Sequence, residues 1–254
     1  MSIEDEGITF EVEEPELQKD GKKVIRKGVY LLPNLFTTAG LFSGFFAIIA
    51  SMNGQFEKAA IAITVAANLD VMDGAVARMT KTQSEFGAQY DSLHDLVSFG
   101  VAPAILIYAW SLQELGKLGW MAAFIYVACA ALRLARFNSQ NQKEDKKYFT
   151  GLGSPASALL IVGLVWTCVE YDFAPVRLVM ILALFVCFWC AFLMVSNFKF
   201  ASPKRVDLQG RVPFVVILGP VFCLAVFFIN PPVVMLVVAL VYSFSGPVLG
   251  ILKR

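Results

Sequence analysis

Long apolar stretches repeat along almost the whole chain and constrain its fold more than any other feature. A helix needs roughly 20 such residues to cross a hydrocarbon core of about 30 Å. Eight stretches approach this length, at 31–52, 56–77, 91–112, 117–138, 154–170, 175–195, 212–229 and 231–250. Helices satisfy their own backbone hydrogen bonds in lipid, so they are the structure these stretches favour. The sequence therefore predicts an all-α, polytopic membrane helix bundle with about eight transmembrane helices.

Polar residues are concentrated at the N-terminus and in short connections. Hydrophobic residues make up 57% of the 254 residues and charged residues only 16%, which leaves no room for a separate soluble domain. We expect a cytoplasmic polar segment over 1–30 and a transmembrane domain over 31–254. The polar segment lacks the apolar core of a secretory signal peptide, so we expect it to be retained. Residues 22–33 mix basic and apolar positions and suit either an amphipathic helix on the membrane surface or an irregular basic linker.

Basic residues mark the cytoplasmic side of a membrane protein, because Lys and Arg accumulate in short cytoplasmic connections. Placing both termini in the cytoplasm puts eighteen of the 21 Lys and Arg residues on that side and leaves Lys58, Lys117 and Arg177 outside. The sequence therefore predicts insertion in the cytoplasmic membrane with both termini cytoplasmic. It also predicts that the longer polar connections, 139–153 and 197–211, are cytoplasmic and mobile. A net charge of +1 gives no reason to expect a nucleic acid partner.

Four aspartates stand where membrane helices usually avoid charge. Asp70 and Asp73 come at the end of the second apolar stretch, and Asp91 and Asp95 at the start of the third. Each such charge costs on the order of 2.5–3.5 kcal/mol to insert, so a favourable partner is needed. Helical geometry places the first two about 60° apart and the last two about 40° apart, so each pair shares one face. Roughly a dozen residues join the two stretches, and an antiparallel hairpin would bring the two pairs opposite each other.

A group of four carboxylates at such a place predicts a metal site on the cytoplasmic side. Oxygen ligands favour Mg²⁺ or Mn²⁺ over zinc, and two such ions close together are a recurring device for displacement at phosphorus. In the alternative, a hairpin held only by salt bridges, Arg78 would satisfy one acid and leave three unpaired. We therefore expect two divalent cations held by the four aspartates. We interpret His94, the only histidine, as a polar side chain at the membrane interface rather than as a ligand.

Small and basic residues near the acids suit a phosphate or a nucleotide. Gly74 follows the second acid, where the missing side chain lets a phosphate approach the backbone. Arg78 offers forked hydrogen-bond donors to phosphate, and Gly87 provides another position for close approach or a turn. These neighbours favour chemistry at phosphorus over other uses of the acids.

The residues described so far form one continuous motif. The run is Asp70-x2-Asp73-Gly74-x2-Ala77-Arg78-x8-Gly87-x3-Asp91-x3-Asp95, and it resembles the complete motif of the CDP-alcohol phosphotransferases. Segments 32–51, 86–104 and 131–138 resemble the phosphatidylserine synthase branch of that family, the CDP-diacylglycerol–serine O-phosphatidyltransferases. The resemblance covers residues 30–155 well and is mainly a hydrophobic pattern beyond them. Gly153 is a departure, because that branch leads us to expect proline there.

The resemblance implies an activity and a set of partners. It implies transfer of the phosphatidyl group of CDP-diacylglycerol to the hydroxyl of L-serine, giving phosphatidylserine and CMP. Asp70, Asp73 and Asp91 would be metal ligands. Asp95 would ligate metal and also act as the general base that takes the proton of the acceptor hydroxyl. The partners implied are CDP-diacylglycerol, L-serine, membrane lipids and a second copy of the chain in a homodimer.

Further residues receive roles from the same resemblance. Gly74, Arg78 and Gly87 would line the site of the CDP-lipid. Asn34 and Thr37, at the cytoplasmic start of the first stretch, would reach its phosphates; their alternative role is to cap the first helix.

Two arginines, Arg133 and Arg136, lie at the cytoplasmic end of the fourth stretch, at the depth of the acids. They would bind the serine carboxylate or the lipid phosphate, or else serve only as anchors. Two other functions stay open: the same chemistry with another acceptor, such as glycerol phosphate or inositol phosphate, and transport of a divalent cation. Transport is disfavoured because the coupling sites of transporters lie near the membrane midplane, whereas these acids lie at one end of their helices.

Overall fold

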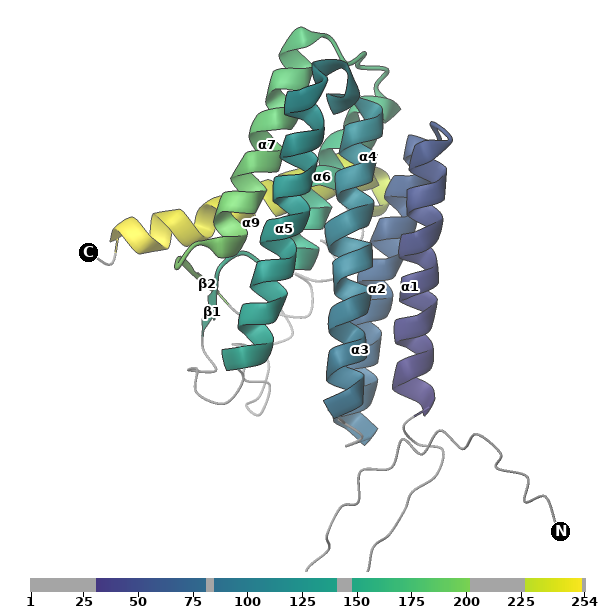
Figure 1. Cartoon of the computed structure of the whole chain (residues 1–254), viewed down its shortest axis with the longest axis vertical. Coiled ribbons are helices and arrows are strands. Elements are labelled where there is room, and N and C mark those ends of the chain that lie inside the picture. The colour runs from purple at the N-terminus through teal and green to yellow at the C-terminus, as the bar shows by residue number, and fades with distance from the viewer. Residues whose placement is uncertain (1–30, 81–84, 141–147, 202–226, 253–254) are drawn as a thin grey trace, which may run out of the picture.

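The computed structural model describes residues 31–80, 85–140, 148–201 and 227–252. In chain order the elements are α1 (Leu31–Met52), α2 (Phe56–Thr80), α3 (Glu85–Asp95), η1 (Leu96–Val101), α4 (Ala102–Trp110), η2 (Leu112–Leu115), α5 (Lys117–Gln140), β1 (Tyr148–Thr150), α6 (Ser154–Glu170), α7 (Arg177–Val195), β2 (Lys199–Ala201) and α9 (Pro231–Leu252). Most of the helices stand side by side in a bundle, with one short pair of strands near α5 (Figure 1).

Six helices are long and apolar enough to cross a membrane: α1, α2, the continuous rod α3–η1–α4, α5, α7 and α9. Helix α6 is apolar but shorter, with 17 residues. Seven of the eight predicted spans thus correspond to described helices, and the chain is a polytopic helical membrane protein. The predicted span 212–229 and the segment 22–33 lie almost entirely outside the described residues.

The hairpin of α2 and α3 is longer than the apolar pattern predicts. Helix α2 continues to Thr80 and α3 begins at Glu85, so both helices extend beyond the predicted spans, which end at 77 and begin at 91. Hydropathy does not detect these extra turns, because they are polar and lie beyond the apolar stretch. Asp70, Asp73 and Asp91 therefore lie within regular helices, whereas Asp95 is the last residue of α3.

A π-helical segment, η1 at Leu96–Val101, interrupts the third span directly after the last motif aspartate. Pro103 lacks an N–H and so cannot pair with the carbonyl of Phe99, four residues earlier. The hydroxyl of Tyr126 on α5 donates to that carbonyl instead, at 2.9 Å. The predicted span at 91–112 thus corresponds to one continuous rod, in which a π-helical segment separates two α-helical parts.

Small residues on α1 let it approach α2 and α3 closely. Gly40 and Gly44 face the rod α3–η1–α4, where an added Cβ would collide with His94 or Ser98 respectively. The Ser43 hydroxyl donates to a backbone carbonyl of α2 at 2.8 Å. Helix α1 therefore packs closely against both helices that carry the motif residues.

Apolar side chains of α4, α5, α6 and α7 pack together in the core of the bundle. Ile107, Tyr126, Ile161 and Cys187 are fully buried there. Because α4 continues the rod that carries Asp91 and Asp95, the core fixes the direction in which these acids point.

The two polar connections expected to be mobile contribute a short β-ribbon. Strand β1 runs antiparallel to β2, with Phe149 opposite Phe200. Phe200 is fully buried, and its ring lies against α9 at Gly246, where an added Cβ would collide with it. Residues 148–150 and 199–201 are therefore ordered strands of the fold, because Phe200 packs onto α9.

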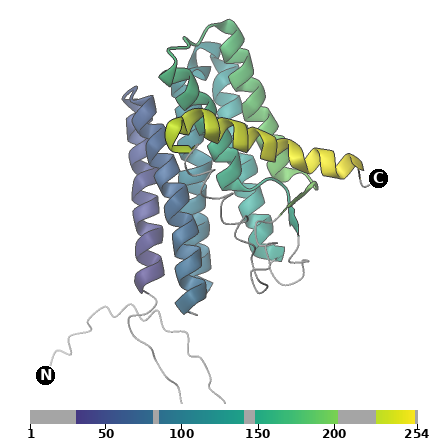
Figure 2. The same cartoon turned by 180° about the vertical axis from the view of Figure 1, so that it is seen from behind.

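Helix α9 runs across the bundle rather than along it, and its C-terminal end projects to one side (Figures 1 and 2). Gly163 of α6 permits this close crossing, since an added Cβ there would lie 2.8 Å from the backbone of Leu236. The length and composition of α9 suit a membrane span, whereas its direction differs from those of its neighbours.

Candidate active site

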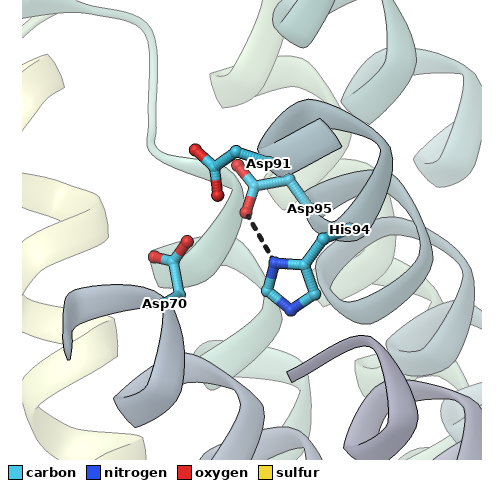
Figure 3. A group of neighbouring side chains, drawn as sticks. All are labelled: Asp70, Asp91, His94 and Asp95. Carbon is cyan, nitrogen blue, oxygen red and sulfur yellow. Dashed lines mark ion pairs between the residues drawn. The ribbon is translucent and has the colours of Figure 1, made fainter. Parts of the chain in front are cut away.

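Side chains from α2 and α3 converge on one point in the bundle (Figure 3). Asp70 extends from α2, and Asp91, His94 and Asp95 extend from α3. One ligand atom from each of these four residues, which we call the α2–α3 cluster, lies within 4.8 Å of the others. Asp91 and Asp95 are about one helical turn apart, so both face α2. The predicted antiparallel hairpin thus brings acids from both helices together.

The protein alone satisfies the α2–α3 cluster poorly. Asp91 Oδ1, Asp95 Oδ1 and His94 Nδ1 are buried and have no hydrogen-bond partner among the described residues. Buried polar atoms normally have partners, and carboxylates this close repel each other unless positive charge lies between them. A hard divalent cation would satisfy these oxygens, and carboxylates suit Mg²⁺ or Mn²⁺. The donor set therefore fits a metal ion.

Asp73 is the predicted ligand that lies outside the α2–α3 cluster. Its Oδ2 accepts a hydrogen bond of 2.8 Å from the Thr37 hydroxyl of α1, and only 5% of the residue is exposed. The carboxylate remains near enough to Asp70 and Asp91 to act on them electrostatically. The fourth acid is thus tied to α1, and its role as a metal ligand stays a prediction.

His94 lies inside the site, so its interpretation as an interfacial side chain is wrong. The residue is fully buried, and its Nδ1 lies 3.9 Å from Asp95 Oδ1. Its ring meets that of Phe99 edge-on, with the centroids 5.6 Å apart. Hydropathy could not reveal this position, because it does not show which side of α3 faces α1. The available signal was the spacing, since His94 follows Asp91 by three residues and so lies beside it on the helix.

Three predicted residues of the CDP-lipid site lie on the two helices that carry the cluster. Gly74 borders open space, since no described atom lies within 4 Å of an added Cβ. Gly87 lies on α3, one turn before Asp91. Arg78 belongs to the last turns of α2, and its side chain lies outside the described part of the structure. No described residue outside its own helix blocks close approach to Gly74, and the roles of Gly74, Gly87 and Arg78 at the CDP-lipid stay predictions.

Asn34 and Thr37 lie inside α1 and do not cap it, because the helix begins three residues before Asn34. The capping alternative is therefore wrong. The next residue, Thr38, donates to the Asn34 carbonyl at 2.7 Å, and its hydroxyl lies 2.9 Å from that of Tyr90 on α3. Sequence reasoning missed Tyr90, whose contact with α1 depends on the helix packing.

Arg133 and Arg136 contact different parts of the chain. Arg133 Nη1 donates to the Ser154 hydroxyl at 2.9 Å, and the guanidinium lies near enough to Asp95 to act on it electrostatically. Its Nε is buried and has no partner among the described residues. Arg136 Nη2 instead donates to Asn197 Oδ1 at 3.0 Å, in the connection that follows α7. Arg133 therefore lies beside the cluster, and its role in binding substrate stays a prediction.

A second contact that sequence reasoning missed ties α3 to α5. Asn138 Nδ2 donates to the Ser92 hydroxyl at 3.0 Å. Ser92 directly follows Asp91, so this bond helps to hold the acid-bearing turn in place. The sequence offers no local signal for such a pair, because the two residues meet only once α3 and α5 pack.

Similarity to known proteins agrees with the arrangement of these residues. The chain matches the family model of the CDP-alcohol phosphatidyltransferases over residues 30–242. It is 34% identical to a Helicobacter pylori protein over 203 residues, which are 80% of this chain and 84% of that protein. A Methanocaldococcus jannaschii protein is 36% identical over 178 residues, covering 70% and 76%. A Bacillus subtilis protein is 32% identical over 174 residues, covering 68% and 92%.

All three relatives bear the name CDP-diacylglycerol–serine O-phosphatidyltransferase. The family match spans the helices that carry the α2–α3 cluster, Asp73 and Arg133. The chain therefore belongs to the CDP-alcohol phosphatidyltransferase family.

Proposed function

We propose that this chain transfers the phosphatidyl group of CDP-diacylglycerol to the hydroxyl of L-serine and releases phosphatidylserine and CMP. The observation that carries the proposal is the α2–α3 cluster, with its buried and unsatisfied carboxylate oxygens. The acceptor follows from the relatives, whose names specify serine and which match most of this chain.

The cluster supports a cofactor of two divalent cations, Mg²⁺ or Mn²⁺. Asp70, Asp91 and Asp95 supply carboxylate oxygens, and Asp73 joins them from the next turn of α2. Bound there, the cations would neutralise the pyrophosphate of the lipid substrate and make its phosphorus easier to attack. The role of the chain itself is to hold these carboxylates facing one another before the substrate arrives.

Asp95 takes the proton of the acceptor hydroxyl in the proposed reaction. As the serine oxygen bonds to the lipid-side phosphorus, the bond between that phosphorus and the CMP oxygen breaks, and CMP leaves with the electron pair. The phosphatidyl group passes directly to serine, so no covalent enzyme intermediate forms. Asp95 suits this role because it lies in the cluster and near Arg133, the candidate site of the serine carboxylate, and its second carboxylate oxygen can take the proton while Oδ1 faces the metal. A positioned general base contributes about 10²- to 10⁴-fold in rate.

Arg133 is our candidate for the group that binds the serine carboxylate. It lies near Asp95, so a serine held by its guanidinium would have its hydroxyl close to the proposed base. The bond to Ser154 leaves further guanidinium donors, including the buried Nε, to meet a carboxylate. Guanidinium and carboxylate match in a bidentate geometry, which favours arginine over lysine here.

The CDP-lipid would approach from the side of Gly74, where the backbone is open. Gly87, Arg78 and Asn34 are proposed to line the same site. Thr37 would act indirectly, because its hydroxyl already holds Asp73.

The basic residues suggest how the enzyme is oriented. We propose that it is inserted in the cytoplasmic membrane, with residues 1–30 as a cytoplasmic segment, 31–254 as the transmembrane domain, and both termini and the active site facing the cytoplasm. The resemblance further suggests a homodimer.

A panel of acceptors tests the proposed function. Purified enzyme, CDP-diacylglycerol and Mn²⁺ are incubated with labelled serine, glycerol phosphate or inositol phosphate, and both labelled lipid and CMP are measured. The proposal predicts one CMP for each phosphatidylserine and little product from the other acceptors. Product from glycerol phosphate or inositol phosphate alone would overturn the choice of serine and keep the transferase chemistry.

A further inference from the structure

His94 is a buried polar residue that the proposed reaction does not use. It is fully buried, comes between two proposed metal ligands on α3, and places Nδ1 on the side of the α2–α3 cluster (Figure 3). We propose that His94 is itself a metal ligand through Nδ1, beside the carboxylates of Asp70, Asp91 and Asp95. This inference rests on the proposed metal site and adds a nitrogen to its oxygen ligands.

The distance between His94 and Asp95 suits a shared ion better than a direct contact. Their nearest atoms, Nδ1 and Oδ1, are 3.9 Å apart, which is too long for a hydrogen bond. Two atoms that each bind one ion at about 2.1 Å can lie no more than about 4.2 Å apart. The separation therefore falls where two ligands of one ion would be found.

The packing of α1 holds the ring in this orientation. The edge that carries Nε2 faces the backbone of α1 at Gly40, where an added Cβ would lie only 2.6 Å from Nε2. Phe99 packs edge-on against the ring. With α1 occupying the space beside Nε2, Nδ1 is the nitrogen left to face the acids. Metal-binding histidines are commonly oriented by what the other ring nitrogen meets, and α1 supplies that constraint here.

A purely structural histidine explains these observations less well. Such a residue would normally pair its ring nitrogens, yet neither Nδ1 nor Nε2 has a hydrogen-bond partner in the described ranges. Asp91 Oδ1 and Asp95 Oδ1 lack partners in the same part of the chain. One cation among Nδ1 and these two oxygens would satisfy all three atoms at once.

A nitrogen ligand changes which metal the site prefers. Imidazole suits transition ions, whereas Mg²⁺ favours oxygen ligands alone. His94 should therefore raise the affinity for Mn²⁺ more than that for Mg²⁺. Replacing it should weaken Mn²⁺ binding by about 10- to 100-fold, the range found when groups supporting a metal site are lost, and should affect Mg²⁺ less.

Pulsed electron paramagnetic resonance of bound Mn²⁺ tests the ligand directly, because the chain has a single histidine. The full chain is purified with a tag that contains no histidine and is loaded with Mn²⁺ alone. We expect ¹⁴N modulation typical of imidazole, and we expect ¹⁵N-histidine labelling to replace it by ¹⁵N coupling. This isotope exchange needs no substitution, so it does not depend on the folding of a variant.

Two variants complete the test. His94→Ala should lose the nitrogen coupling and weaken Mn²⁺ binding, whereas Ser98→Ala, one turn further along the same face against α1, should retain both. Mn²⁺ bound without nitrogen coupling in the unaltered chain, or with coupling that survives in His94→Ala, would overturn the role of His94 and leave the carboxylate site standing. Failure of the unaltered chain to bind Mn²⁺ would overturn the metal site of the proposed function as well.

Discussion

Thr37 holds the motif aspartate that stands apart from the other three. Its hydroxyl donates to Asp73 at 2.8 Å in a buried setting, where a hydrogen bond to a charged group contributes about 1.5–3 kcal/mol. Thr37→Val keeps the shape and removes the donor, so we expect kcat to fall roughly 10- to 100-fold through misplacement of Asp73. Thr37→Ser keeps a hydroxyl and should retain most of the activity. Full turnover by Thr37→Val would show that α1 does not position this acid.

The two arginines differ in their surroundings, which makes them a matched pair. Arg133 lies near Asp95, whereas Arg136 contacts Asn197 outside the cluster. We expect Arg133→Ala to raise the serine KM by roughly 10- to 150-fold, because a charge-assisted contact to a carboxylate contributes about 1.5–3 kcal/mol. Arg136→Ala should change it much less. Steady-state kinetics with serine varied at saturating CDP-diacylglycerol distinguish the two, and equal effects would contradict the assignment.

At the scale of single residues, the sequence predicted the acids well and their partners poorly. Asp70, Asp91 and Asp95 meet as expected, because fixed spacing on two helices determines which faces they share. Thr37 and His94 depend on how α1 packs, which no local pattern encodes. Gly153 departs from the expected proline, yet its φ of −58° and ψ of 139° are values that proline adopts. That departure therefore changes the backbone little.

At the scale of the elements, the π-helical segment η1 accepts a hydrogen bond from another helix. Tyr126 donates to the Phe99 carbonyl that Pro103 cannot satisfy. Tyr126→Phe removes this donor from a buried carbonyl, so we expect the free energy of unfolding in detergent to fall by about 1–3 kcal/mol. Pro103→Ala restores an N–H, and in the Tyr126→Phe background it should recover part of that loss. Equal stability of the single and double variants would contradict this explanation of η1.

The helices and strands also include features that a hydropathy pattern does not predict. Apolar stretches predicted seven described helices, because crossing lipid demands about 20 apolar residues. The polar turns that extend α2 and α3 lie beyond the apolar stretches and were missed. The β-ribbon depends on Phe200 packing against α9, a contact between residues far apart in the chain. Such long-range contacts follow from the assembled fold and not from local composition.

For the whole molecule, the orientation in the membrane rests on the distribution of basic residues. The turns after α1 and α6 lie at the same end of the bundle (Figure 1). In a background without the five native cysteines, Asn53→Cys and Phe173→Cys at those turns should react with an impermeant thiol reagent outside intact cells. Ser2→Cys, Lys143→Cys and Lys204→Cys should react only after the membrane is opened. The reverse pattern would place the active site on the wrong side for the proposed orientation.

The central claim is that the α2–α3 cluster performs a metal-dependent phosphatidyl transfer. The most direct test measures CMP release and labelled phosphatidylserine together, in the unaltered enzyme and in Asp95→Asn, with chelator and then with added Mn²⁺ or Mg²⁺. We predict no turnover in chelator, recovery on adding the metal, and loss of at least about 10²-fold in Asp95→Asn at every metal concentration. Full turnover in excess chelator, or unchanged turnover in Asp95→Asn, would contradict the account.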